Sequence, residues 1–418
     1  MSGRFARVIA SACIVASGCD LLTDSFVTND FSGDLQPIGV DTSSGAVIVG
    51  VREEGKNDRT AIVDVLSPFT LDDPGENITP FVRYTNWSVL GRDATDQLAL
   101  SRALLRDARI LTLHPCADAE CFIGPGSAGR PFQAIIGADS LAGDALRLRL
   151  GDQQIFILAD VAGGEQERGL ACDAVYPSPY RGGGTLVIAG TELGFSGRRV
   201  TMPACLGFDP DIELPQSQRG ADVLLLVSTA IGPSILGETA YERYREVRPT
   251  APALDQLPDA IAFLPSGPIT GKRATVDRVA LVARSGSTPR APCRHVFAHH
   301  LLLERDCVAG EDCPCEDGTT FCPLPGLVEL TPSAGIDVLV VSDEDPTLQA
   351  LRTELRPDQP EVDGILGTGA LGGVELDIDY PHDRVLARCA GPGCATRPAL
   401  PEKTDRARVA ECLRRSMQ

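Results

Sequence analysis

A repeated segment most constrains how this chain can fold. Residues 135–143 read Ile-Ile-Gly-Ala-Asp-Ser-Leu-Ala-Gly, and residues 365–373, which lie 230 positions later, read Ile-Leu-Gly-Thr-Gly-Ala-Leu-Gly-Gly. The match continues without a gap: residues 146–150 alternate leucine with arginine where residues 376–380 alternate apolar residues with aspartate. A period of two predicts a strand with one buried face in each copy. The chain is therefore expected to fold as two related halves.

Each copy is preceded by another apolar segment that ends in a polar turn. Residues 60–71 form the first, and residues 46–52 are its predicted hairpin partner. Residues 222–236 form the second, with residues 185–189 as the predicted partner and a helix predicted over residues 237–246. Plentiful glycine and proline, 42 and 31 residues, also favour many short strands and turns.

The order of these segments resembles the pepsin-like and retropepsin-like aspartic peptidases. Each lobe of those proteins has a strand that ends in Asp-Thr-Gly or Asp-Ser-Gly, and later two hydrophobic residues and a glycine. Residues 62–70 look like the first catalytic strand and residues 226–233 like the second, while 135–137 and 365–367 supply the later motif. The resemblance covers about residues 44–395. It implies an all-β fold with a few short helices, two lobes and a cleft between them.

The chemistry of that family requires two carboxyl groups that share one proton. The resemblance assigns Asp64 to the first catalytic position, and Ser228, followed by Thr229, to the second. A hydroxyl group cannot replace a carboxyl group in this proton sharing. Val65 and Leu66 replace the Thr-Gly of the family and are expected to misplace the backbone amides around Asp64. These departures predict a catalytically inactive protein.

Asp337 is the alternative partner for Asp64. It lies only 30 residues before the second glycine motif, whereas Asp64 lies 73 residues before the first and Ser228 lies 139 residues before the second. Because a lobe has to fit a hairpin and several strands into this interval, the spacing favours Ser228. Asp337 is expected near the start of a strand that precedes a helix over residues 347–355.

The N-terminus carries an export signal. Arg4 and Arg7 precede a short apolar run at residues 8–15, and three small residues stand directly before Cys19. The run is too short to span a bilayer. Small residues before a cysteine resemble the bacterial lipobox, which implies that Cys19 is lipidated and anchors the protein to a membrane of the cell envelope, facing the periplasm or the cell surface. An ordinary signal peptide with an incidental cysteine is the alternative.

The predicted organisation has five parts. They are a signal peptide at 1–19, a tether at 20–43, an N-terminal β lobe at 44–165, a C-terminal β lobe at 166–395, and a tail or helix at 396–418. The second lobe is longer because of a predicted insertion at about 293–322, which is rich in cysteine and histidine.

The cysteines agree with an oxidising compartment. The chain has 14, and removal of Cys13 and Cys19 leaves an even number. Three close pairs are disulfide candidates: Cys116 with Cys121, Cys172 with Cys205, and Cys389 with Cys394. The sequence does not fix the connectivity of the other six, which are Cys293, Cys307, Cys313, Cys315, Cys322 and Cys412.

Two histidines offer an alternative use for some of these cysteines. His295 and His299 have the i, i+4 spacing of a helix and lie near the cysteines of the insertion, which would suit a zinc site. Disulfides usually claim such cysteines in exported proteins. No metal or other cofactor is therefore predicted.

The net charge of −19 excludes nucleic acid as a partner, because such a surface repels phosphates. Three functions stay open. The first is a catalytically inactive lipoprotein that binds a peptide or protein in the interlobe cleft. The second is an active or residually active aspartic endopeptidase, and the third is a structural envelope protein.

Overall fold

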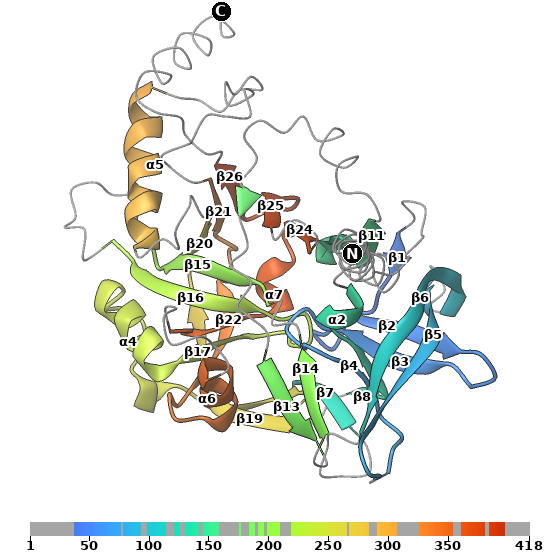
Figure 1. Ribbon diagram of the computed structural model, residues 1–418. Helices are drawn as coiled ribbons and strands as arrows, with labels where there is room; N and C mark the ends of the chain where they lie inside the picture. The colour runs from blue at the N-terminus through green and yellow to red at the C-terminus, as the bar shows by residue number, and fades with distance from the viewer. Residues whose placement is uncertain are drawn as a thin grey trace, which may run out of the picture.

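The computed structural model describes residues 37–76, 78–92, 98–113, 121–125, 130–141, 145–158, 175–176, 184–188, 191–195, 199–209, 219–265, 267–283, 291–306, 326–353, 361–380 and 384–397 (Figure 1). Within these ranges the protein is mostly β with a few short helices. The all-β fold class with a few short helices, which the resemblance implied, is confirmed.

Six strands of the N-terminal half close into a barrel in the order β2–β3–β9–β4–β6–β5. Their bounds are β2 Ile48–Glu53, β3 Arg59–Val63, β4 Thr70–Asp72, β5 Phe81–Arg92, β6 Leu98–Thr112 and β9 Ala134–Ile136. β2 and β3 form the hairpin predicted for residues 46–52 and 60–71, with Ile48 opposite Ile62.

The C-terminal half is built on a 12-stranded sheet in the order β26–β21–β20–β15–β16–β23–β17–β22–β19–β18–β7–β8. The bounds are β7 Cys121–Pro125, β8 Arg130–Phe132, β15 Thr201–Leu206, β16 Ala221–Val227, β17 Ser234–Gly237, β18 Asp259–Leu264, β19 Gly267–Val276, β20 Val279–Val282, β21 Leu327–Leu330, β22 Ile336–Val341, β23 Gly364–Leu366 and β26 Cys394–Arg397. Two strands from the N-terminal half, β7 and β8, thus extend the sheet of the other half.

The hairpin partner predicted for residues 222–236 is wrong. Residues 185–189 do not pair with β16: β13 Gly184–Ile188 forms a separate hairpin with β14 Thr191–Phe195. β16 pairs instead with β15, where Leu225 lies opposite Met202. Only two residues separate β13 from β14 in the sequence, and strands this close pair more readily than distant ones.

The helices are short. They are α2 Ala138–Leu141, α4 Glu238–Val247, α5 Pro292–Asp306, α6 Pro346–Thr353 and α7 Thr368–Leu371, with single 3₁₀ turns η2 Leu150–Asp152 and η4 Leu254–Gln256. The helices predicted over 237–246 and 347–355 are present as α4 and α6. Across the described ranges, no helix combines the length and apolar character needed to cross a membrane.

The two halves repeat one arrangement of strands in the same register. In the first half β3 runs parallel to β9, with Val63 opposite Ile136. In the second half β16 runs parallel to β23, with Val227 opposite Leu366. β9 and β23 each also pair antiparallel with the strand after the polar turn, β4 and β17 respectively. The sequence repeat therefore corresponds to a repeated structural unit.

This crossing of strands explains the repeated glycines. A Cβ atom on Gly137 would overlap the carbonyl oxygen of Phe69, and one on Gly367 would overlap that of Pro233. Both glycines are needed because the polar turn of the same half passes directly over the end of the strand. The requirement concerns space and not an unusual backbone angle.

A six-stranded sheet joins the halves in the order β1–β11–β10–β24–β25–β12. Its strands are β1 Ile38–Gly39, β10 Ala145–Arg149, β11 Gln154–Leu158, β12 Val175–Tyr176, β24 Val374–Asp379 and β25 Arg384–Cys389. The apolar residues predicted on a buried face of β10 and β24 belong to one core cluster that also contains residues of both halves. Burial across the boundary makes the halves one folding unit.

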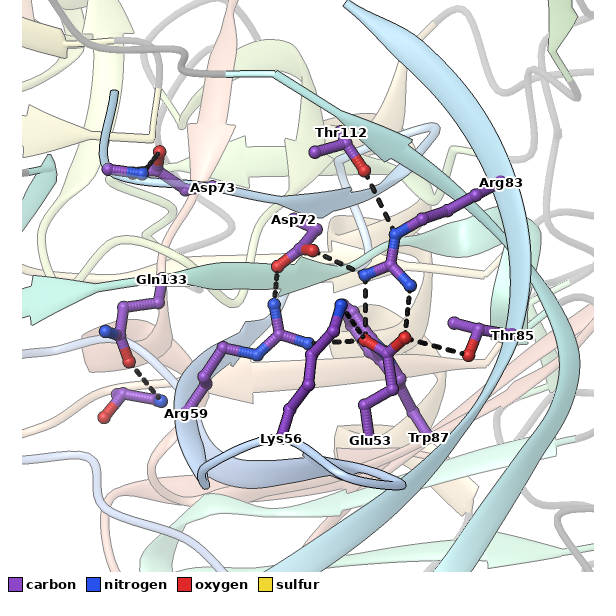
Figure 2. A network of polar contacts seen from close by, with 12 residues as sticks. Glu53, Lys56, Arg59, Asp72, Asp73, Arg83, Thr85, Trp87, Thr112 and Gln133 are labelled. Carbon is purple, nitrogen blue, oxygen red and sulfur yellow. Dashed lines mark hydrogen bonds and ion pairs between the residues drawn. The ribbon is translucent and has the colours of Figure 1, made fainter. Parts of the chain in front are cut away.

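Figure 2 shows an ion-pair network at one end of the barrel, centred on Glu53 at the end of β2. Glu53 accepts hydrogen bonds from Arg83 at 2.5 and 2.9 Å, from Lys56 at 3.0 Å and from Arg59 at 3.1 Å. Asp72 accepts from the same two arginines. Because Arg59 begins β3 and Asp64 follows its end, the network lies at the opposite end of that strand from Asp64.

Glu53→Gln is expected to cost about 3 kcal/mol of stability at pH 7, since it removes the carboxylate shared by the basic side chains and leaves Asp72 to balance both Arg59 and Arg83. Burial alone would raise the pKa of Glu53, but hydrogen bonds from Arg83 and Lys56 lower it to about 2. A lowered folded pKa gives stability that is present above the unfolded value and is lost as the pH falls towards 2. Urea unfolding between pH 7 and pH 2 measures both effects.

Asp58→Asn is the control for this measurement. It removes the exposed Arg52–Asp58 pair on the same hairpin and should cost less than about 1 kcal/mol. An acid-dependent loss of stability that is the same in Glu53→Gln as in the wild type would contradict the role assigned to Glu53.

Candidate functional site

The repeated strands bring Asp64 and Ser228 to equivalent positions. Asp64 directly follows β3, and its N–H donates to the Ile136 carbonyl at 3.0 Å. Ser228 directly follows β16, and its N–H donates to the Leu366 carbonyl at 3.0 Å. The two residues thus make the same backbone bond in the same register, so Ser228 is the structural counterpart of Asp64.

The two side chains meet between the halves and are almost fully buried. The Ser228 hydroxyl donates to Asp64 Oδ1 at 3.0 Å, and the Ala230 N–H donates to that hydroxyl oxygen at 3.1 Å. Only 4% of Asp64 and 1% of Ser228 is exposed. The hydroxyl therefore has both a donor and an acceptor partner inside the protein.

Thr229 forms hydrogen bonds that join the loop after β16 to the loop after β3. Its hydroxyl donates to the Val63 carbonyl at 2.6 Å and accepts from the Val65 N–H at 3.2 Å. Its own carbonyl accepts from the Val47 N–H at 2.8 Å. Val65 occupies the position equivalent to Thr229 and has no hydroxyl, so these side-chain hydrogen bonds come only from the residue of the C-terminal half.

The expected misplacement of the amides around Asp64 is wrong. The Leu66 N–H donates to Asp64 Oδ1 at 3.1 Å, and the Thr229 N–H donates to the same oxygen at 3.3 Å. The β-branched Val65 did not prevent this, because the turn keeps negative φ angles: the positive-φ residues other than glycine in the described chain are Asp107 and Gln153. The carboxylate thus receives one amide from its own loop and one from the loop of the other half.

A buried arginine that the sequence reasoning missed acts on this site. Burial raises the pKa of Asp64, whereas hydrogen bonds from Leu66, Ser228 and Thr229 and the positive charge of Arg199 lower it. Arg199 is 5% exposed and immediately precedes Val200, whose carbonyl accepts from the Val227 N–H.

The corresponding bond in the first half runs from Val63 to Val47, so Arg199 stands where that half has Ala46. An alignment of the two apolar strands on these valines would have revealed an arginine beside the core. Among the described residues, the side chains of the site therefore include the carboxyl group of Asp64, the hydroxyl groups of Ser228 and Thr229, and the nearby cation Arg199. Within the part of the chain that the structure describes, the groups that act on Asp64 do not include the second carboxyl group that proton sharing requires.

Asp337 does not approach this site. It lies on β22, where it forms an ion pair with Arg273 at 2.9 Å, and its side chain is 45% exposed. β22 runs parallel to β17 as β6 runs parallel to β4 in the first half. Asp337 is thus on the strand that follows the hairpin of its lobe, as its short spacing to the glycine motif indicated.

Contacts other than the six-stranded sheet also join the halves. β7 pairs with β18, with Gly124 opposite Phe263 and Pro125 opposite Ala262. A guanidinium N–H of Arg109 on β6 donates to the Gly194 carbonyl on β14 at 2.9 Å. In Figure 1, β7 and β8 lie in the lower part of the view and β24 and β25 in the upper part. These contacts and the buried site hold the halves firmly against each other.

The disulfides correct one predicted pair. Cys389 is bonded to Cys394, as predicted. Cys205 is bonded to Cys293, which lies 88 residues away, so the predicted pair Cys172–Cys205 is wrong. Proximity in sequence misled the prediction because β15 and the start of α5 meet only in the folded C-terminal half. Cys19, Cys116 and Cys172 lie outside the described residues, and the pairing of Cys116 with Cys121 stays a prediction.

The histidines of the predicted insertion lie on α5. His299 is fully buried, burial lowers the pKa of His295, and His300 contacts Glu329 at 2.7 Å. Among the residues that the structure describes, no group of three or more His, Cys, Asp or Glu side chains is arranged to hold a metal ion. His299 is thus part of the buried face of α5, and His300 joins α5 to β21 through Glu329.

Comparison with known proteins gives structural neighbours without sequence relatives. No protein-family model and no curated protein matches the chain. The chain is similar to the crystal structure of basic 7S globulin from soybean, with a TM-score of 0.40 and 10% sequence identity over 85% of this chain and 94% of that one. It is also similar to the aspartic proteinase from Irpex lacteus, with a TM-score of 0.35 and 10% identity over 85% of this chain and 97% of that one.

Proposed function

We propose that this protein is a catalytically inactive member of the aspartic-peptidase fold, held at a membrane of the cell envelope by a lipid on Cys19, and that it acts by binding a peptide or protein. The observation that carries the proposal is the bond from the Ser228 hydroxyl to the buried Asp64 carboxylate at 3.0 Å. The Ser228 hydroxyl lies where the peptidases have the second carboxyl group of their acid–base pair, and a hydroxyl cannot share a proton as that group does.

The chemistry of peptide hydrolysis explains why this substitution matters. One carboxylate has to take a proton from water while a second, protonated carboxyl group polarises the scissile carbonyl. A serine hydroxyl has a pKa far too high to alternate between these states. Loss of one acid–base partner commonly lowers the rate by about a hundredfold to ten-thousandfold. Binding by the two-lobed body does not depend on that chemistry.

The purified protein is expected not to cleave acid-unfolded protein between pH 2 and pH 7. It should also fail to bind a peptide analogue whose central hydroxyl has to lie between two carboxyl groups. Mass spectrometry of the digest and calorimetry with the analogue measure these outcomes. Acid-optimum cleavage that Asp64→Asn abolishes would establish the active endopeptidase as the correct alternative.

Binding is tested separately with an immobilised library of random peptides at pH 5 to pH 7. The wild type and Asp64→Asn should retain the same set of peptides, because Asp64 is buried and its bonds are made inside the protein. Failure to retain any peptide, in a protein that is folded and inactive, would favour the structural envelope protein instead.

The lipid anchor is expected to determine the location of the protein. The wild type expressed in a bacterium should sediment with membranes and partition into detergent, whereas Cys19→Ala should be released in soluble form. Ser17→Ala serves as the control, since it keeps a small residue before the cysteine. A Cys19→Ala variant that still partitions with membranes would refute the anchor.

A further inference from the structure

One face of the six-stranded sheet carries a ladder of opposite charges across the boundary between the halves. β10 contributes Arg147 and Arg149, and β24 contributes Glu375 and Asp377. Arg147 Nε lies 2.8 Å from Asp377 Oδ1 and 3.5 Å from Glu375 Oε1, and Arg149 also contacts Glu375. The opposite face of these strands belongs to the apolar core.

The Arg147–Asp377 pair occupies a special place in this ladder. Asp377 lies 230 positions after Arg147, which is the offset of the internal repeat, and the two residues are direct cross-strand partners. Neighbouring pairs join non-equivalent positions, since Arg149 lies opposite Glu375 and Ala145 opposite Asp379. The axis that relates the two copies therefore passes between Arg147 and Asp377.

These charged side chains are buried, so the sign of each charge strongly affects the stability of the fold. Asp377 is 4% exposed and Glu375 is 3% exposed. The side chain of Arg147 is 14% exposed. A buried charge that loses its partner or faces a like charge is strongly destabilising, whereas opposite charges directly across two strands are favourable.

We propose that the Arg147–Asp377 ion pair makes an N-terminal half pair with a C-terminal half and not with a second half of its own kind. Two β10 strands paired in this register would place Arg147 against Arg147, and two β24 strands would place Asp377 against Asp377. Two copies of a duplicated chain could otherwise pair like with like through this sheet. Because of these charges, an N-terminal half pairs only with a C-terminal half, which can belong to the same chain or to a second copy.

Charge reversal in the full chain tests the pair within one molecule. Arg147→Asp and Asp377→Arg should each lower the equilibrium constant for folding roughly 100-fold or more, because each places like charges together in a buried sheet. The chain that carries both changes should recover most of the wild-type stability. A double variant that is no more stable than the single variants would overturn the proposal.

Mixing the two single variants tests selection between molecules. When the two variants are unfolded and refolded together, the N-terminal half of each can pair with the C-terminal half of the other. One such contact then has the reversed ion pair and the other has the wild-type pair, so a heterodimer of twice the monomer mass should form. Neither variant should form it alone, because exchange between identical copies restores nothing. Light scattering after size-exclusion chromatography measures the mass. Recovery in the double variant without a heterodimer in the mixture would overturn selection between partners.

The Arg273–Asp337 pair supplies the matched control. It has the same residue types on neighbouring strands, lies within one half, and its side chains are 67% and 45% exposed. Arg273→Asp and Asp337→Arg should each lower the folding constant less than about fivefold and should form no heterodimer on mixing. A heterodimer from these variants would show that exchange does not depend on the boundary between the halves, and would overturn the proposal.

Discussion

Ser228→Asp is expected to destabilise the protein by about 3–5 kcal/mol at pH 7, because it adds a second buried carboxylate against Asp64. Burial already raises the pKa of Asp64, and the nearest group is now a hydroxyl that donates to it. A second carboxyl group at this place would have to remain protonated or face a like charge. The variant thus places two carboxyl groups in a buried site where Arg199 already offsets the charge of Asp64.

The pH dependence of this loss follows from the sign of the shift. The added carboxyl group has a folded pKa above its unfolded value, so its protonated form is the compatible one. The variant should therefore lie closest to the wild type near pH 4 and lose stability as the pH rises towards 7. Urea unfolding at the two pH values, followed by circular dichroism, measures the difference.

Ser228→Asn separates size from charge in this experiment. It has almost the shape of aspartate but does not ionise, so its loss of stability should be similar at both pH values. Equal losses at pH 4 and pH 7 for Ser228→Asp would contradict the prediction. Acid-optimum peptidase activity in that variant would show that Ser228 alone keeps the protein inactive.

Removal of the Cys205–Cys293 disulfide is expected to cost about 4–5 kcal/mol on the chain-entropy model. The two cysteines are buried and lie 88 residues apart, so the bond closes a long loop of the unfolded chain. It also fixes the start of α5 against the sheet, where Asp222 accepts from the Cys293 N–H at 2.7 Å. Replacement of both cysteines by alanine and urea unfolding test this prediction.

The Cys389–Cys394 disulfide is the internal comparison, because its cysteines are only five residues apart. Its removal should cost about 2 kcal/mol, less than half the effect of the long bridge. If removal of the short bridge proved the more damaging, loop length would not be the source of the stabilisation. The packing of Cys389 and Cys394 against the apolar core would then need to explain the result.

Asp64 and Ser228 show how much of the site the sequence predicted. Local periodicity and spacing identified the repeated strands, since side chains on a half-buried strand must alternate and a lobe needs a minimum length between its motifs. The same spacing rejected Asp337, which is exposed on β22. The resemblance to the aspartic peptidases then placed Ser228 where that family has its second carboxyl group, and no packing can give a serine hydroxyl the acidity of a carboxyl group.

Only the tertiary structure revealed the contacts between residues that are far apart in the sequence. Arg199 acts on Asp64 across 135 positions of sequence, and Cys205 bonds Cys293 where a nearer cysteine was expected. The Leu66 amide reaches Asp64 because its turn is held on both sides, by the Thr229 hydroxyl, which accepts from the Val65 N–H, and by the Ala138 N–H, which donates to the Ser67 carbonyl. Periodicity reports which face of a strand is buried, but the partner that buries it depends on the free energy of the whole packed chain.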